Sequence, residues 1–117
     1  MPSKSPDLAL KDILHHIDLA EHFTAGFDYA TFRDDLRTLY AVTRCLEIVS
    51  EASRRLAEDL KVRHSTIAWR DMAAAGNIYR HDYEDVAAIY VWITLKQHLP
   101  PLRRVVVQEL ERLGYRI

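Results

Sequence analysis

The residues best suited to chemistry lie together at positions 76–83, in the run Gly-Asn-Ile-Tyr-Arg-His-Asp-Tyr. Arg80, His81 and Tyr83 fall within four residues, where one predicted helix ends and the next begins. An imidazole moves protons near neutral pH, and a guanidinium binds a phosphate and stabilises the charge that develops on it. A neighbouring His and Arg are therefore a minimal set of groups for cleaving RNA without a metal ion.

Helical periodicity gathers the polar residues of this region on one face. Arg70, Asn77, Arg80 and His81 share that face with several alanines, and the apolar positions 68, 72, 75 and 79 form the other. Arg70 and His81 are separated by roughly 16 Å along the helix axis. The two serve one site only if the helix bends, or if a symmetric dimer brings Arg70 of one subunit to His81 of the other.

The charged residues also have simpler explanations than a site that cleaves RNA. A His near a helix end is often a surface group that the helix dipole stabilises. Glu47 and Glu51 have arginine neighbours at helical spacing, which surface ion pairs explain, and a role in orienting the His from across the bundle stays open. The chain lacks the paired Glu-x-x-His elements that carboxylate metal sites in bundles use, so we expect no metal.

Length and composition predict a single soluble domain spanning residues 1–117, with residues 1–7 as a polar lead. The 16 basic and 17 acidic residues nearly cancel, so any nucleic-acid contact must come from a local basic patch. The single cysteine, Cys45, excludes an internal disulfide and a Cys-based zinc cluster, and it fits a reducing compartment. The start of the chain has no apolar core of a signal peptide, and the longest apolar run, 86–95, is too short to span a membrane. We therefore expect a cytoplasmic protein with no membrane contact.

Periodicity and capping residues predict an all-α, antiparallel bundle of four or five helices. Asp7 caps a first helix over residues 8–23. Asp28 or Thr31 caps a long second helix that reaches residue 60 with a coiled-coil-like seam of apolar and small residues. Ser65 or Thr66 caps a third helix that ends at residue 80.

The C-terminal part is predicted to form two more segments. Asp82 caps a fourth helix over residues 86–98, which is apolar almost all round, so we expect one of its sides to meet a second subunit. Pro100 and Pro101 must stop or kink this helix. A last segment over residues 102–113 ends at Gly114.

Four segments then point to a family. They read YAVTRCLEIVSEA at 40–52, IAWRDMAAAGN at 67–77, RHDY at 80–83 and LPPL at 99–102. They resemble, in order, the "aveRaLEiigEAa" segment, the "ipWreiagmRN" segment, the motif and the "lp-L" break of the HepT-like family of HEPN-domain proteins. This family is the toxin half of bacterial and archaeal two-gene systems, and the resemblance covers about residues 8–113.

The family's motif is Arg, four intervening residues, His, any residue and Tyr. His81 and Tyr83 match it, and Asn77 matches the Asn that often follows the Arg, but Gly76 stands where the Arg is expected. The resemblance implies that Arg80, as in the variant Gly-Asn-x-x-Arg-His-x-Tyr, replaces the missing Arg. Arg70 is the other candidate.

By resemblance, the chain is the toxin of a type VII toxin–antitoxin system and a metal-independent endoribonuclease with no cofactor, acting on RNA such as tRNA. His81 is then the general acid or base, Arg80 binds the scissile phosphate, and Asn77 orients the His or contacts the phosphate. The resemblance also implies a homodimer or higher oligomer whose two motifs share one cleft.

The partner implied by the resemblance is a minimal nucleotidyltransferase antitoxin of the MntA type, which transfers AMP to Tyr83. The alternative is a non-catalytic helical subunit that docks this nucleotidyltransferase or presents a substrate to it. Gly76 favours that alternative, and retention of the His-x-Tyr pair disfavours it.

Overall fold

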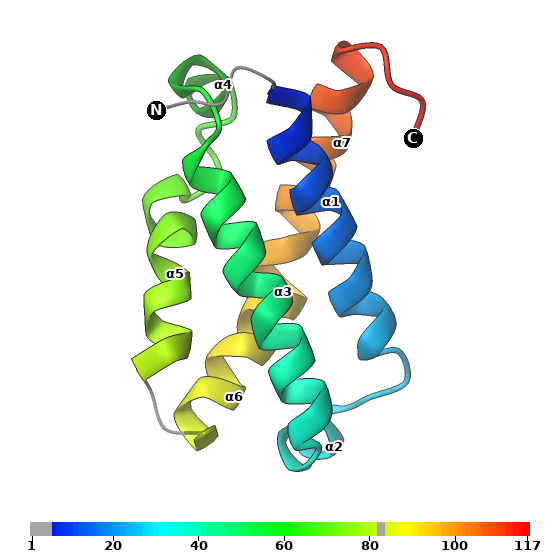
Figure 1. Cartoon of the computed structure of the whole chain (residues 1–117), viewed down its shortest axis with the longest axis vertical. Coiled ribbons are helices and arrows are strands. Elements are labelled where there is room, and N and C mark those ends of the chain that lie inside the picture. The colour runs from blue at the N-terminus through cyan, green and yellow to red at the C-terminus, as the bar shows by residue number, and fades with distance from the viewer. Residues whose placement is uncertain (1–5, 82–83) are drawn as a thin grey trace.

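The structure, a computed structural model, describes residues 6–81 and 84–117, without the side chains of residues 77–81 and 84–87. All regular elements in the described part are helical, which confirms the all-α prediction (Figure 1). They are α1 (Pro6–Phe23), α2 (Tyr29–Asp34), α3 (Leu36–Arg54), α4 (Glu58–Arg63), α5 (Trp69–His81), α6 (Glu84–Ile93), the π-helical turn η1 (Thr94–His98) and α7 (Leu99–Arg112).

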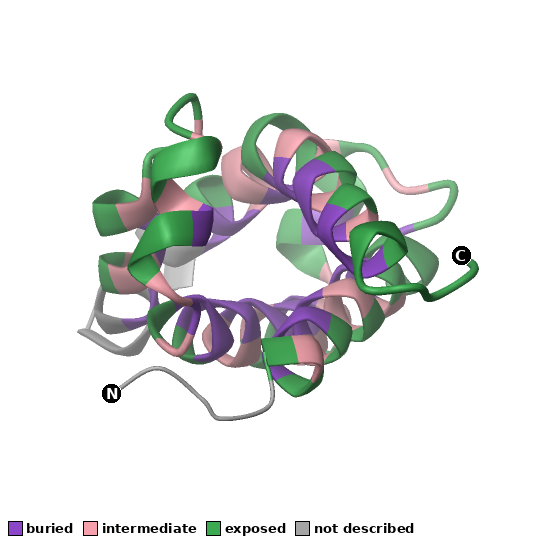
Figure 2. Cartoon of the chain, turned by 90° about the horizontal axis from the view of Figure 1, so that it is seen from above, coloured by how far each residue is buried: buried purple, intermediate pink, exposed green. Residues whose placement is uncertain are grey.

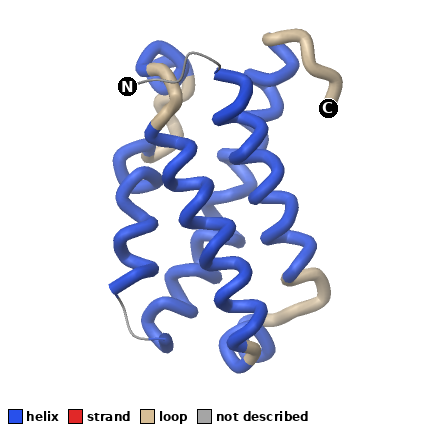
Figure 3. The backbone as a smooth tube through the Cα atoms, in the orientation of Figure 1, coloured by secondary structure: helices blue, strands red, loops and turns tan. Residues whose placement is uncertain are grey.

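The long helices run up and down the bundle, with α3 between α1 and α5 (Figures 1 and 3). Helix α3 packs most extensively against these two neighbours, α6 packs against α2 and α3, and α7 returns beside α1. Buried residues face the middle of the ring of helices (Figure 2). The fully buried members of this core include Ile13, Ile17, Phe32, Val42, Val49, Leu99, Leu102 and Val106.

Helix α1 forms where it was predicted, and its residues Leu10, Ile13, Ile17 and Ala20, which recur at helical spacing, are all buried. Its start differs, because the helix begins at Pro6 and Asp7 lies in its first turn instead of capping it. Proline is tolerated there because the first N–H groups of a helix have no intrahelical acceptor. Asp7 instead accepts a hydrogen bond of 2.7 Å from the Tyr115 hydroxyl, which joins the two ends of the chain.

The single long second helix is wrong, because the chain divides that region into α2, α3 and α4. Asp28 caps α2 as expected, but Asp35 accepts a 3.1 Å hydrogen bond from the Thr38 N–H and begins a new helix. The break turns α2 so that the fully buried Phe32 ring packs against the Trp92 ring of α6, with 5.2 Å between the ring centroids. Burial of an aromatic ring here outweighs the continuous periodicity of the sequence.

The third helix also begins later than predicted, at Trp69, so neither Ser65 nor Thr66 caps it. The indole N–H of Trp69 donates to the carbonyls of Lys61 and His64 at 3.1 and 3.0 Å. These bonds satisfy carbonyls at the end of α4 and fix residues 65–68 as the connection. The predicted cap Asp82 lies outside the described residues.

The prolines do not stop the helix that precedes them. Helix α6 passes through η1 into α7, and the Leu99 N–H bonds to the Thr94 carbonyl five residues back. Pro100 and Pro101 thereby fall in the first turn of α7, where a missing N–H costs little. Gly114, with φ of 97°, ends α7 as predicted, with hydrogen bonds from its own N–H to Glu111 and from the Tyr115 N–H to Leu110.

No helix within residues 6–81 and 84–117 combines the length and the apolar character needed to cross a bilayer.

A buried carboxylate joins α4 to α7. Glu109 is 5 % exposed and accepts hydrogen bonds from Arg63 Nη2 at 2.8 Å and His64 Nε2 at 2.7 Å. Burial raises the pKa of Glu109, but the bonds from Arg63 and His64 outweigh it and bring the pKa below its ordinary value of 4.5. Ionised Glu109 therefore stabilises the fold.

We expect Glu109→Gln to lower the free energy of unfolding at pH 7 by about 1–3 kcal/mol, because it removes the buried carboxylate that pairs with Arg63 and with the partly buried His64. The folded-state pKa is lowered, so this stability is present above the unfolded pKa and is lost as the pH falls through the folded value. Urea unfolding between pH 3 and 7 should show the difference shrinking at low pH. The exposed Glu111→Gln is the control, and a difference that stays constant with pH contradicts the argument.

Candidate functional site

A polar groove lies between α3 and α5. Its volume is about 180 Å³, and we call it the α3–α5 groove. The lining residues are Arg44, Glu47, Ile48, Ser50, Glu51, Arg54, Arg55 and Gly76. A wider hollow of about 550 Å³ lies beside the first turns of α5 and is lined by Glu58, Lys61, Val62, Ser65, Trp69, Arg70 and Ala73. Arg54 connects the two, since it lines the groove and donates to the carbonyl of Ala73.

Side-chain hydrogen bonds hold α5 against α3 at this groove. The Ser50 hydroxyl donates to the Ala73 carbonyl at 2.9 Å and accepts a long, 3.4 Å hydrogen bond from the Gly76 N–H. Arg54 donates from Nε and Nη2 to the same carbonyl at 3.0 and 2.6 Å. A Cβ on residue 76 would lie 3.3 Å from the Ser50 Oγ, so the contact is built around a glycine.

The predicted motif lies at the end of this helix. Helix α5 continues through positions 77, 80 and 81, whose side chains are outside the described part, and Tyr83 lies outside it altogether. At 3.6 residues per turn, these three backbone positions fall on the side of α5 that carries Ala73. Position 80 lies about 40° around the helix from Gly76 and so borders the α3–α5 groove, whereas position 81 lies about 140° from Gly76 and about 20° from Arg70, on the side of the hollow.

Arg70 is exposed and lines the hollow together with Lys61. Because α5 runs as one helix from Trp69 to His81, Arg70 stays roughly 16 Å along the axis from the motif end. The structure therefore does not bring Arg70 and His81 together within one chain, and the bent-helix alternative is wrong.

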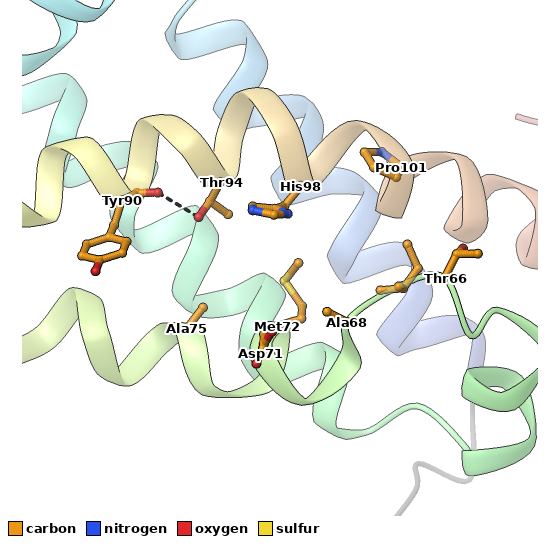
Figure 4. Close-up of a pocket in the computed structure, with 10 residues that line it drawn as sticks. Thr66, Ala68, Asp71, Met72, Ala75, Tyr90, Thr94, His98 and Pro101 are labelled. Atoms are coloured by element: carbon orange, nitrogen blue, oxygen red, sulfur yellow. Dashed lines mark hydrogen bonds between the residues drawn. The ribbon is translucent and has the colours of Figure 1, made fainter.

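The opposite side of α5 borders an apolar pocket of about 410 Å³ (Figure 4). Met72 and Ala75 face Tyr90, Thr94 and His98 of the α6–η1 segment across this pocket (Figure 4). The predicted apolar stripe is therefore core only in part, since Met72 is buried but Ala68 is exposed. The polar and apolar sides of α5 are thus separated.

Helical spacing assigns the charged residues of this groove to surface ion pairs, with an orienting role left open for Glu47 and Glu51, and it does not single out Arg44. Glu51 pairs with Arg54 at 3.6 Å, and Arg55 pairs with Asp12 at 3.0 Å, as that reading expects. Arg44 and Glu47 form no ion pair within the described part of the chain, yet both line the groove. The signal for them was the recurrence of charged residues at 44, 47, 51 and 54, which places them along one face of α3.

No group of three His, Cys, Asp or Glu side chains in the described part of the chain is arranged to hold a metal ion.

Comparison with known proteins places the chain among ribonuclease-named relatives. The sequence model of the family "Ribonuclease HepT-like" matches residues 13–109. A Thermococcus cleftensis protein named "Probable ribonuclease HepT" is 38 % identical over 94 residues, 80 % of this chain and 86 % of that protein. "Putative RNase MJ0125" of Methanocaldococcus jannaschii is 30 % identical over 114 residues, 95 % of this chain and 98 % of that protein. No solved structure matches the chain.

We expect Gly76→Val to lower the free energy of unfolding by about 1–3 kcal/mol, because its branched side chain meets Ser50. In a Ser50→Gly background, Gly76→Val should lower the free energy of unfolding by a smaller amount. The coupling free energy between the two positions should be about 0.5–3 kcal/mol. Thermal and urea unfolding of the four proteins in this cycle measure the coupling. Ala74→Val, at an exposed position of α5, is the control, and additive effects at positions 50 and 76 would refute the contact.

Proposed function

The chain belongs to the ribonuclease HepT-like family, and from that premise we propose that it is a metal-independent endoribonuclease that cleaves RNA at the C-terminal end of α5. The observation that carries the proposal is the fixed approach of α5 to α3 beside a groove lined with arginines. The proposal is supported by the fact that α5, which carries the motif positions at its C-terminal end, borders a groove where three arginines stand beside Glu47 and Glu51. The names of the relatives support the same reaction class.

In the proposed reaction His81 takes the proton from a ribose 2′-hydroxyl, and the 2′-oxygen attacks the adjacent phosphorus. The bond from phosphorus to the 5′-oxygen breaks, that oxygen receives a proton, and a cyclic 2′,3′-phosphate remains. Arg80 binds the phosphate and stabilises the charge on its oxygens as they crowd in the transition state. Asn77 orients the imidazole or contacts the phosphate.

The proposed assembly is a homodimer in which two motifs share one cleft. Two large apolar side chains of α6 are partly exposed, Ile89 at 38 % and Tyr90 at 47 %, and they support a second subunit at this helix. A dimer also offers the remaining route for Arg70, which then acts on the motif of the partner chain.

We propose further that this chain is the toxin of a type VII toxin–antitoxin pair, whose minimal nucleotidyltransferase antitoxin transfers AMP to Tyr83. A phosphodiester two residues from His81 adds negative charge and bulk where an RNA phosphate must enter. Inhibition then requires no unfolding.

A non-catalytic docking subunit is the second candidate, and Gly76 is the observation that favours it. A Cβ at position 76 would lie 3.3 Å from the Ser50 Oγ, so α5 packs against α3 through a glycine where the family motif has an arginine. If Arg80 does not take over the role of that arginine, the helical surface still serves to bind the nucleotidyltransferase.

Purified protein should cleave total tRNA in excess chelator and leave cyclic phosphate ends. We expect His81→Ala and Arg80→Ala to lower the rate by about 100-fold or more, because each removes a group that acts in the transition state. His15→Ala, an exposed His on α1, is the matched control and should cleave at the wild-type rate. Absence of cleavage by well-folded protein, with RNA supplied in excess, would favour the docking subunit.

Incubation with the cognate nucleotidyltransferase and ATP should add AMP to this chain and abolish its cleavage activity. Tyr83→Phe should gain no AMP in intact-mass measurements and should continue to cleave RNA in the presence of the antitoxin. Tyr90→Phe, an exposed tyrosine on α6, should still be modified. Modification of Tyr83→Phe to the wild-type extent would place the acceptor elsewhere.

A further inference from the structure

We propose that Arg44 binds a backbone phosphate of the RNA from the α3 side of the α3–α5 groove. Arg44 thus becomes a substrate-binding residue that lies outside the motif. The inference rests on the proposed ribonuclease function and adds a second contact point for the substrate on a different helix.

The register of the two helices places Arg44 near the motif. Ser50 contacts Gly76 and Arg54 contacts Ala73, so the helices are antiparallel, as Figure 1 shows. Arg44 lies six residues before Ser50, a rise of about 9 Å toward the end of α5 that carries the motif. An equal number of residues beyond Gly76 reaches just past His81, where α5 ends.

Arg44 is also the groove arginine whose guanidinium is not committed to the fold. Arg54 is bound to Ala73 and Glu51, and Arg55 to Asp12. Arg44 is exposed, and no hydrogen bond or ion pair occupies it in residues 6–81 and 84–117. A guanidinium presents its donors in a planar fork that matches two phosphate oxygens, so a free one at the rim of a groove suits a phosphodiester.

Two carboxylates, Glu47 and Glu51, line the same groove. They determine whether removal of a negative charge there should strengthen or weaken RNA binding. The charge of Glu51 is offset by Arg54 at 3.6 Å. Glu47 is half-buried, lies one turn from Arg44 and forms no ion pair in the described part of the chain. A phosphate bound to Arg44 is repelled by Glu47, so removing that negative charge should strengthen RNA binding.

The test measures binding of a labelled single-stranded RNA oligonucleotide by fluorescence anisotropy, using the full chain in a His81→Ala background that prevents cleavage. We expect Arg44→Ala to weaken binding by about tenfold, the size of one charge-assisted contact, and to reduce the slope of log K against log salt by about 0.7. The affinity of Arg44→Lys should fall between the affinities of the parent protein and of Arg44→Ala. Glu47→Gln should bind the RNA about two- to threefold more tightly than the parent protein. Arg104→Ala, an exposed arginine on α7, should bind within about twofold of the parent protein.

Unchanged affinity and salt slope in Arg44→Ala, with weakened binding in Arg80→Ala, would overturn the role of Arg44 and leave the proposed function standing. Weaker binding in Glu47→Gln would also count against a phosphate at this position. Failure of the parent protein to bind RNA, together with no cleavage by the wild type, would overturn both proposals. The melting temperature of each variant confirms that a change in binding does not come from unfolding, since both Arg44→Ala and Arg44→Lys alter an exposed side chain.

Discussion

The close contact between α3 and α5 is the constraint on which the site depends. One carbonyl of α5, that of Ala73, accepts hydrogen bonds from both Ser50 and Arg54. The two donors come from successive turns of α3, so they fix α5 along its axis as well as across the interface. The last turn of α5 is therefore presented from a fixed direction, whatever RNA or partner then meets it.

This contact also divides α5 into two sides with different surroundings. On one side lie the charged residues of α3 and the hollow with Lys61 and Arg70. On the other, Met72 and Ala75 border a largely apolar pocket with Tyr90 (Figure 4). On the polar side, cationic and carboxylate side chains are interleaved, since the same groove and hollow are also lined by Glu47, Glu51 and Glu58.

Much of the fold could be predicted because it follows from local pattern. The stripe of α1 and the glycine at the end of α7 were both visible in the sequence. The break at Asp35 was not, because an Asp on the surface of a continuous amphipathic pattern looks the same whether it caps a helix or lies within one. The position of Arg44 in the groove was hidden for a similar reason, since helical spacing alone does not distinguish a residue of a surface ion pair from one that lines a groove.

The interpretation of Gly76 differs most between the sequence and the structure. In sequence this glycine marks a missing arginine, whereas in the structure it is the small partner of Ser50. The turn η1 also separates what the sequence joins. It is a π turn, which holds one residue more than an α turn. The buried positions of α6 and α7 form a single stripe in sequence, yet α6 faces α2 and α3 while α7 faces α1. The extra residue turns α7 by about 100° about the common axis, the rotation of one residue. A relative with one residue fewer in this segment can therefore close the turn to an ordinary α-helix and still present both faces as they are here.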